Sequence, residues 1–358
     1  MRTSVTGGLE AAILQPFFSA YALVSHKLVR VGMAEAVSLP VPVCSVGGIS
    51  FGGTAKTPTV QYLGRRMSRW GRRPGVALRG WKGRLDRTGA PPALVSDGRR
   101  ILLDWETAGD EARLHAERLL ADRIPVAVGR DRVEACRLLI DQANVDILLL
   151  DDAFQFTRLG RNFDLALVDC IAPFGRPDGR PGPMREPVPA LERADAIVLT
   201  HSEAVSDGRL DRIKTRLREL VRDLPPVFVS RTHVGQLRDN PSGEGRFPFI
   251  LDGRRVVAFS GIGNPLSFQA TLEGLGCDVA HLFAFPDHHP FKRSDLLRID
   301  RRARHLGAET LITTSKDEVR LVGKYDAFSL PVQVVEIEVK IDNEKRFLEI
   351  VCDRMGLS

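Results

Sequence analysis

The residues with the clearest chemical potential form one glycine-rich stretch, Ser50–Thr57 (SFGGTAKT). Loops that bind nucleotide phosphates turn consecutive backbone N–H groups toward the phosphates, and they carry a lysine for the outer phosphates and a hydroxyl for Mg²⁺. Lys56 and Thr57 supply these last two groups. The strict pattern G-x-x-x-x-G-K-[ST] is not met, because Ser50 and Ala55 replace its two glycines. We predict a phosphate-binding loop for ATP and Mg²⁺ that consists of Ser50, Phe51, Gly52, Gly53, Thr54, Ala55, Lys56 and Thr57.

Two aspartates follow an apolar segment farther along the chain. Ile147–Leu150 is apolar throughout and leads into Asp151 and Asp152. A buried strand that ends in an acid can deliver a carboxylate beside the Mg²⁺ of a phosphate-binding loop. Many strands end in aspartate, so this segment indicates a metal site only because a phosphate-binding loop precedes it in the chain. We predict that Thr57 and one of the two aspartates hold the metal, and the residues alone do not choose between Asp151 and Asp152.

Two further clusters combine acids with a possible base. Gly109–Glu111 (GDE) stands at the start of a helical pattern, where acids can simply complement the helix dipole. Phe285–His289 (FPDHH) places an acid beside two histidines on a loop bounded by prolines. From the residues alone this loop could orient a base, bind a metal or do neither. Zinc is disfavoured, because no other His or Cys stands at ligand spacing.

A rigid loop is expected at Pro181–Pro187 (PGPMREP), which presents Arg185 and Glu186 between prolines. Arginine is suited to recognising phosphate or a sugar, although a structural salt bridge explains the pair nearly as well. Glu186 is a further candidate for the metal site.

The order of apolar and amphipathic segments predicts the fold class. Buried strands that alternate with helices indicate a parallel sheet with helices on both faces, as in P-loop NTPases. We expect strands at Val41–Val46, Val76–Leu78, Val126–Val128, Ile147–Leu150, Leu165–Val168 and Ile197–Leu199, a hairpin with arms Ala93–Val95 and Arg100–Leu103, and helices at Thr57–Arg69, Asp110–Leu120 and Arg132–Asp141. A second, smaller α/β lobe is expected from strands at Val256–Phe259, Val279–Phe283, Leu311–Thr313 and Val332–Ile337 and helices at Pro265–Leu275, Ser294–His305 and Asn343–Met355.

The composition turns polar around Gln236–Phe249, which marks the expected boundary between the two lobes. We therefore predict a core at residues 36–240 and a C-terminal lobe at residues 241–358 that closes the cleft. Ligands usually bind in such a cleft.

The N-terminal residues 1–35 form a third predicted part. Ala11–Val24 is mostly apolar and is followed by His26, Lys27 and Arg30. The run is too short to span a bilayer, which needs about 20 apolar residues. A helix that lies in the membrane interface and a helix that packs on its own domain fit this stretch equally well.

The net charge of the chain indicates which classes of partner it can bind. The net charge of +6 suits nucleotide phosphates or anionic lipid headgroups. Dense basic runs are missing and aromatic residues make up only 6% of the chain, so nucleic acid is not expected as a partner.

Taken in order, these blocks resemble the tetraacyldisaccharide 4′-kinase (lipid A 4′-kinase) family over nearly the whole chain. The resemblance rests on ten blocks, which are the apolar N-terminal helix, VGGISFGGTAKTP, LRGWKG (78–83), GDE (109–111), VGRDRV (128–133), DDAFQFTRL (151–159), GPMREP, FSGIGNP (259–265), FPDHH (285–289) and TTSKD (313–317).

The resemblance implies transfer of the γ-phosphoryl of ATP to the 4′-hydroxyl of a lipid A precursor, an acylated glucosamine disaccharide 1-phosphate. It implies a peripheral protein at the cytoplasmic face of the bacterial inner membrane, with no obligate protein partner, and so favours membrane contact for the N-terminal helix. Asp110 is then the general base, paired with His288 and near Asp287, while Lys56 acts on the phosphates. The substrate-binding residues implied are Arg79, Glu111, Gln155 and Arg185.

The chain departs from the family pattern at several positions. Ala55 and Ala153 replace glycines, Phe156 replaces a histidine, and Trp81-Lys82 stands where Tyr-Gly is common. These changes indicate a divergent member. Two alternative functions stay open from sequence: a P-loop NTPase switch that acts through a protein partner, and a binding module with a degenerate nucleotide site.

Overall fold

The computed structural model describes residues 35–176, 184–240 and 242–357. The predicted N-terminal helix at Ala11–Val24 lies outside the described residues, and so do Pro181–Pro183 of the predicted rigid loop. The described chain forms an α/β fold around one large, mostly parallel sheet, which confirms the predicted fold class.

Thirteen strands are present in the described part of the chain. They are β1 (Val43–Gly47), β2 (Pro74–Leu78), β3 (Ala93–Ser96), β4 (Val126–Val128), β5 (Ile147–Asp151), β6 (Phe163–Asp169), β7 (Ala196–Thr200), β8 (Val227–Asn240), β9 (Gly245–Arg246), β10 (Arg255–Ser260), β11 (Asp278–Ala284), β12 (Thr310–Thr314) and β13 (Val332–Ile341). Their order across the sheet is β11-β10-β12-β13-β8-β7-β6-β1-β5-β2-β4-β3, with β9 paired to β8.

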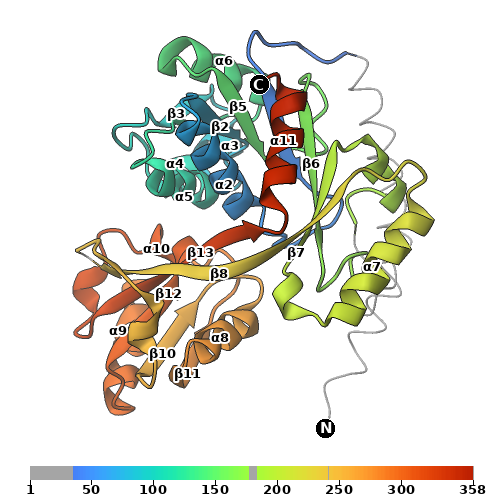
Figure 1. Cartoon of the computed structure of the whole chain (residues 1–358). Coiled ribbons are helices and arrows are strands. Elements are labelled where there is room, and N and C mark those ends of the chain that lie inside the picture. Colours follow the sequence, from blue (N-terminus) through green and yellow to red (C-terminus); the bar gives the residue numbers. More distant parts are fainter. Residues whose placement is uncertain (1–34, 177–183, 241, 358) are drawn as a thin grey trace.

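The helices surround this sheet (Figure 1). The α-helices are α2 (Lys56–Arg69), α3 (Arg84–Thr88), α4 (Trp105–Ala108), α5 (Asp110–Leu119), α6 (Arg132–Ala143), α7 (Asp207–Leu220), α8 (Pro265–Gly274), α9 (Arg293–His305), α10 (Ser315–Glu318) and α11 (Glu344–Met355). Short 3₁₀ helices lie at η1 (Val188–Arg193), η2 (Ser202–Ala204), η3 (Pro248–Leu251) and η4 (Tyr325–Ala327).

The centre of the sheet follows directly from the apolar runs. β1 lies between β5 and β6 in parallel, with Cys44 beside both Leu149 and Phe163. All five residues of β1 and of β5 are buried, as expected for strands that are covered on both faces. The carboxyl ends of β1 and β5 therefore lie side by side, and these ends carry the glycine-rich loop and Asp151.

Strand β8 joins the two lobes. Its first residues pair in parallel with β7, and its remainder pairs antiparallel with β13 along Ser230–Asn240. Figure 1 shows β8 and β13 running together from one lobe toward the other. The polar residues Gln236–Asn240 thus belong to a strand and not to a loop. The division at residues 240 and 241 stays a prediction of domain organisation.

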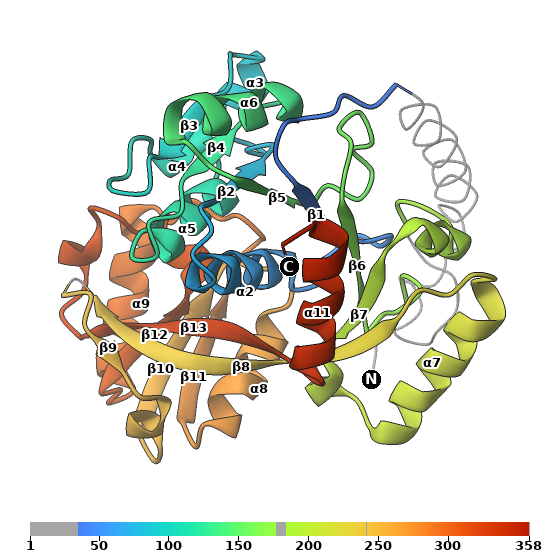
Figure 2. The ribbon, with the colours of Figure 1, turned by 45° about the horizontal axis from the view of Figure 1, so that its top comes forward.

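The last helix packs back onto the first lobe. Phe347, Val351 and Met355 of α11 are buried in the same apolar cluster as Val60 and Phe163. Figure 2 shows α11 between α2 and β6. The helix predicted at Asn343–Met355 as part of the second lobe therefore belongs to the core of the first lobe.

Two sequence predictions of local structure need correction. The second arm of the expected hairpin is reduced to a single bridge between Ser96 and Ile101, and β3 pairs with β4 along its other edge. Helix α7 was not predicted, although Ile213 and Leu217 form its buried stripe at helical spacing. The other positions of α7 are largely charged, so the helical spacing of its apolar residues was not recognised in the sequence.

Candidate active site

The glycine-rich loop joins β1 to α2 in the arrangement that a phosphate site requires. Gly52 has φ of 110°, and Ala55 has φ of 56° immediately before the first residue of α2. Lys56 Nζ lies 3.3 Å from the carbonyl oxygen of Gly52 and 3.4 Å from Thr54 Oγ1. The lysine therefore folds back over its own loop, where phosphate oxygens would meet it together with the free N–H groups at the start of α2.

The replacement of glycine at position 55 has a structural cost. Left-handed backbone brings the Cβ of an L-residue too close to the following carbonyl, at about 1–2 kcal/mol. Glycine lacks this clash but loses more entropy on folding, by roughly 0.4–1 kcal/mol. Ala55→Gly should therefore raise the free energy of unfolding by about 0.5–1 kcal/mol in urea denaturation. Ala270→Gly, at an exposed position inside α8, should lower it by about 1 kcal/mol. Equal losses at both positions would show that Ala55 is unstrained.

The hydroxyl of Thr57 and the end of β5 meet at one point. Thr57 Oγ1 donates to Asp151 Oδ2 over 3.2 Å, and His115 Nε2 lies 2.7 Å from the same oxygen. His115 is fully buried and lies on α5, and Asp151 is 2% exposed. Asp151 Oδ1 and His115 Nδ1 are buried and have no hydrogen-bond partner among the described residues. A hydroxyl and a carboxylate with one unsatisfied oxygen are hard oxygen ligands of the kind that Mg²⁺ takes.

Asp152 has different surroundings from Asp151. It adopts left-handed backbone with φ of 51°, which turns it away from the direction of the strand. Its Oδ1 lies 2.6 Å from Arg185 Nη1 and 3.7 Å from Lys56 Nζ. Burial alone would raise the pKa of Asp152, but the charges of Lys56 and Arg185 hold it below its usual range. Asp152 thus orients the loop lysine and Arg185.

Asp110 is the first residue of α5, and its carboxylate contacts residues of the second lobe. Its Oδ2 lies 2.6 Å from His288 Nδ1 and 3.7 Å from Arg320 Nη1. Burial alone would raise the pKa of Asp110, but the hydrogen bond and charge of His288, with the charge of Arg320, hold it below its usual range. The carboxylate is therefore ionised at neutral pH and able to accept a proton. The predicted pairing of Asp110 with His288 across the lobes is present in the structure.

Two glycines allow Asp110 to take this position. Gly109 has φ of 92°, and a Cβ on it would lie 2.8 Å from the carbonyl oxygen of Trp81. Gly80 has φ of 75°, and its Cβ would lie 2.6 Å from the carbonyl oxygen of Ala108. The backbone of the loop that follows β2 therefore packs directly on the turn that precedes α5. This contact fixes the start of α5 and brings Arg79 and Trp81 beside it.

A second cation approaches from α10. Lys316 Nζ lies 3.8 Å from Glu111 Oε1. Desolvation acts the other way, but the charges of Glu111, Asp110 and further carboxylates raise the pKa of Lys316 above its usual range. Asp287 Oδ2 lies 3.6 Å from His288 Nε2, so His288 has a carboxylate near each ring nitrogen.

The structure reveals three contributors that were not singled out from sequence. They are His115, which contacts Asp151; Arg320, which contacts Asp110; and Lys316. Arg320 is 1% exposed, and it also donates to Asp317 Oδ1 over 2.6 Å and to the carbonyl oxygen of Gly261. A buried guanidinium requires such charge partners. Lys316 lay within the TTSKD block, but His115 in a predicted helix and Arg320 in a segment with no predicted element showed no further signal.

The loop at residues 184–186 is tied to the glycine-rich loop. Arg185 N donates to the carbonyl oxygen of Ile49 over 2.7 Å, and the Arg185 guanidinium lies 5.4 Å from the centre of the Phe51 ring. Glu186 is fully buried and receives two hydrogen bonds from Arg193, at 2.7 and 2.6 Å. Gln155 Nε2 donates to Glu186 and to the carbonyl oxygen of Gly48. These partners hold Glu186 and Gln155 in the loop scaffold, and their predicted metal and substrate roles stay predictions.

The remaining departures from the family pattern have local partners. Arg79 donates to Asp86 over 2.8 Å, and its guanidinium lies 4.9 Å from the centre of the Trp81 ring. The Arg132 guanidinium lies 4.9 Å from the centre of the Phe156 ring. A cation over an aromatic ring is attracted by about 0.5–1 kcal/mol at exposed sites. Phe156 and Trp81 thus each support an arginine near the site.

A buried network of charges joins α5 to the strands that link the lobes. Arg118 of α5 bonds to Glu318 of α10 over 2.6 Å and also to Glu336 of β13. Arg238 of β8 contacts the same two glutamates. Because a buried charge without its partner is costly, this network holds the second lobe in a definite orientation against α5. Asp110 and Arg118 lie on one short helix, so the orientation of the lobes and that of the carboxylate are mechanically linked.

The described residues contain no group of three or more His, Cys, Asp and Glu side chains that could hold a metal ion by itself. Among the same residues, no helix is long and apolar enough to cross a membrane.

Comparisons with known proteins agree on one family. A sequence model described as tetraacyldisaccharide-1-P 4′-kinase matches residues 10–356. A tetraacyldisaccharide 4′-kinase of Syntrophus aciditrophicus is 37% identical over 90% of this chain and 86% of its own length. One of Desulfatibacillum aliphaticivorans is 36% identical over 98% of this chain and 94% of its own length. The crystal structure of LpxK from Aquifex aeolicus in complex with ATP has a TM-score of 0.73 and 27% identity, covering 96% of this chain and 99% of that one.

Proposed function

The chain belongs to the tetraacyldisaccharide 4′-kinase family, and from that premise we propose a role for each residue of the site. The protein is a kinase of lipid A biosynthesis that uses ATP to phosphorylate the 4′-position of its glycolipid substrate. The nucleotide-driven switch that the loop alone also allowed is not favoured. The open questions are which groups perform the transfer and where in the cell it takes place.

Among the steps of the reaction, transfer of the hydroxyl proton to Asp110 is the one that the geometry supports best. The 4′-hydroxyl oxygen forms a bond to the γ-phosphorus while the bond from that phosphorus to the β–γ bridging oxygen breaks, and ADP leaves. The hydroxyl proton passes to Asp110, whose depressed pKa keeps it ionised. His288 and Arg320, which contact the same carboxylate oxygen, orient it and stabilise its charge. The observation that carries this assignment is the 2.6 Å contact between Asp110 and His288 from separate lobes.

The phosphate side of the reaction is assigned to the first lobe. Lys56 and the N–H groups at the start of α2 receive the β- and γ-phosphates, and Arg185 adds a second cation beside Asp152. Thr57 and Asp151 are the residues that would hold Mg²⁺, and the ion would supply positive charge for the phosphate oxygens on which negative charge develops. His115 fixes the orientation of Asp151 through its 2.7 Å contact. Because His115 follows Asp110 by five residues on α5, the base and the histidine that orients Asp151 are separated by roughly 7–8 Å along the helix axis.

The reaction is tested by transfer of label from γ-labelled ATP to a detergent-solubilised acylated glucosamine disaccharide 1-phosphate. We expect label at the 4′-position, one ADP formed per phosphorylated product, and a requirement for Mg²⁺. Without the acceptor, ATP hydrolysis should be slow. Steady hydrolysis that does not respond to the acceptor would contradict this assignment of the site.

We also propose that the protein acts at the cytoplasmic face of the bacterial inner membrane as a peripheral protein. An acylated substrate resides in a membrane, the net charge of +6 suits anionic headgroups, and Ala11–Val24 is apolar with basic residues after it.

Removal of residues 1–30 should weaken sedimentation with anionic vesicles and raise the apparent KM for the glycolipid. The kcat at saturating detergent-solubilised acceptor should change little, because the described site lies outside the removed residues. An unchanged melting temperature serves as the control for folding. If the shortened chain sediments with vesicles as the full chain does, the interfacial role of this segment is wrong.

A further inference from the structure

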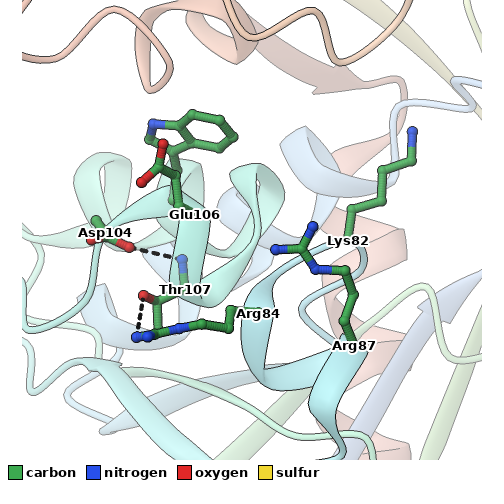
Figure 3. Close-up of a pocket in the computed structure, with 7 residues that line it drawn as sticks. Lys82, Arg84, Arg87, Asp104, Glu106 and Thr107 are labelled. Atoms are coloured by element: carbon green, nitrogen blue, oxygen red, sulfur yellow. Dashed lines mark hydrogen bonds between the residues drawn. The ribbon is translucent and has the colours of Figure 1, made fainter.

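A hollow of about 460 Å³ lies beside the start of α5 and has no part in the transfer chemistry described above. Its wall is formed by the loop after β2 together with α3 and α4. Figure 3 shows the lining residues, which are Lys82, Arg84, Arg87, Asp104, Trp105, Glu106 and Thr107.

The three cations of this hollow are available to a ligand to different degrees. The side chains of Lys82 and Arg87 make no hydrogen bond or ion pair with the described part of the chain, whereas Arg84 Nη2 donates to Thr107 Oγ1 over 3.1 Å. Figure 3 shows Lys82 and Arg87 on one side of the hollow, and Asp104 and Glu106 on the other. Unpartnered cations that line a concave surface favour an anionic ligand.

The two acids do not cancel this charge. Asp104 accepts a hydrogen bond from Thr107 N over 2.7 Å and caps α4, so one of its oxygens already has a partner. Glu106 is the other acid, and its carboxylate can accept hydrogen bonds from sugar hydroxyls. The lining therefore combines a surplus of positive charge with hydroxyl acceptors and the apolar indole of Trp105. A phosphorylated sugar matches all three features.

The hollow lies near Asp110, which is the proposed acceptor of the proton from the reacting hydroxyl. Thr107 precedes Asp110 by three residues, so its Cα lies within about 11 Å of that of the base. A second hollow of about 540 Å³ shares Trp105 and Glu106 and extends onto Pro290–Arg293, which directly follow His289. Lys324 contributes to this second wall, with Nζ 6.0 Å from the centre of the Trp105 ring. The two hollows are thus lined by residues that lie close in the chain to Asp110 and to His288.

We propose that Lys82, Arg84 and Arg87 form the subsite for the phosphomonoester at position 1 of the acceptor sugar. This proposal rests on the proposed function, because the family's substrate carries that phosphate, distant from the 4′-hydroxyl. The phosphate binds the three cations, the adjoining sugar lies over Trp105, and Glu106 accepts its hydroxyl hydrogens. The subsite recognises the substrate away from the reacting atoms, and binding there positions the disaccharide with its 4′-end toward Asp110.

The test compares two acceptors, the acylated disaccharide with its 1-phosphate and the same disaccharide without it. In the double variant Lys82→Ala/Arg87→Ala, KM for the phosphorylated acceptor should rise by on the order of 10²-fold, because two charge-assisted contacts are lost. The KM for the acceptor without phosphate and both kcat values should stay within about twofold, as expected when uniform binding is removed. Lys345→Ala, an exposed lysine on α11, is the matched control and should change neither KM.

Each outcome decides the proposal. An equal rise of KM for both acceptors, or no rise for either, would overturn the phosphate subsite. Direct binding of the two acceptors without ATP separates this failure from a failure of the proposed function. If the wild-type protein binds the phosphorylated acceptor in preference and loses that preference in the double variant, the subsite holds even where no transfer is observed. If transfer occurs and the preference is missing from the wild type, the subsite is wrong while the kinase assignment stands.

Discussion

Lys56→Ala is expected to lower kcat by on the order of 10²-fold or more, which is the loss seen when one electrostatic stabiliser of a transition state is removed. In the structure, Lys56 Nζ lies within 3.4 Å of two oxygens of its own loop and 3.7 Å from Asp152. Two of these contacts lie within the loop itself, and the third is a longer contact with the residue that follows β5. The ammonium is therefore held in place for an incoming phosphate, and its loss affects the charge that develops on the γ-phosphate rather than the fold.

The measurement is kcat at saturating ATP and acceptor, together with the melting temperature. The melting temperature separates a catalytic loss from unfolding, because the Lys56 side chain is only 13% exposed and contacts Asp152. Lys345→Ala provides the control for removing one lysine and should leave kcat unchanged. Near-normal turnover of a purified, folded Lys56→Ala protein would show that this loop does not bind the transferred phosphate.

The central part of the fold could be predicted because its signals are local. Ile147–Asp151 and Val43–Gly47 are buried throughout, and short uninterrupted apolar runs between helical patterns are typical of strands in a parallel sheet. Strand β8 could not be predicted in the same way. Its residues Arg231–Asn240 alternate irregularly between exposed and buried positions, and they become a strand through pairing with β13, which is about one hundred residues away.

The residues of the site differ in the same way. The roles of some can be recognised from their neighbours in the sequence, whereas the roles of others depend on contacts that form on folding. The phosphate-binding loop is contiguous, so all of its groups could be named from sequence. The pairing of Asp110 with His288 joins residues 178 positions apart and was implied only by the family resemblance. His115 and Arg320 were missed because their roles depend on which carboxylate lies opposite them after folding. The choice between Asp151 and Asp152 was open for a similar reason, because only the left-handed backbone at Asp152 sends their side chains to different partners.

The proposed base, Asp110, takes its partners from the other lobe. Asp110 belongs to the first lobe, whereas His288 and Arg320 belong to the second. The buried network of Arg118, Glu318 and Glu336 holds α5 against that lobe. If the lobes move apart, Asp110 loses its orienting partners while Lys56, Thr57 and Asp151 remain together. Under the proposed roles we expect nucleotide binding to need the first lobe alone and proton transfer to need both.

Asp110→Asn follows from this division as the most specific expected result. The substitution nearly keeps the shape of the side chain but removes the proton acceptor, so kcat should fall by roughly 10²–10⁴-fold. The Kd for ATP should change little, because the phosphate-binding loop is untouched. His288→Ala should cost less, since the carboxylate keeps Arg320 at 3.7 Å. The double variant should be about as slow as Asp110→Asn alone, because residues that act as a unit are not additive.

The kcat values of both single variants and of the double variant decide between a coupled pair and two separate contributions. His305→Ala, an exposed histidine at the end of α9, is the control for removing an imidazole from the same lobe, and its kcat should match the wild type. Losses that multiply in the double variant would mean that His288 acts independently of the carboxylate. A fully active Asp110→Asn protein would exclude Asp110 as the proton acceptor, because an amide in its place cannot take the hydroxyl proton.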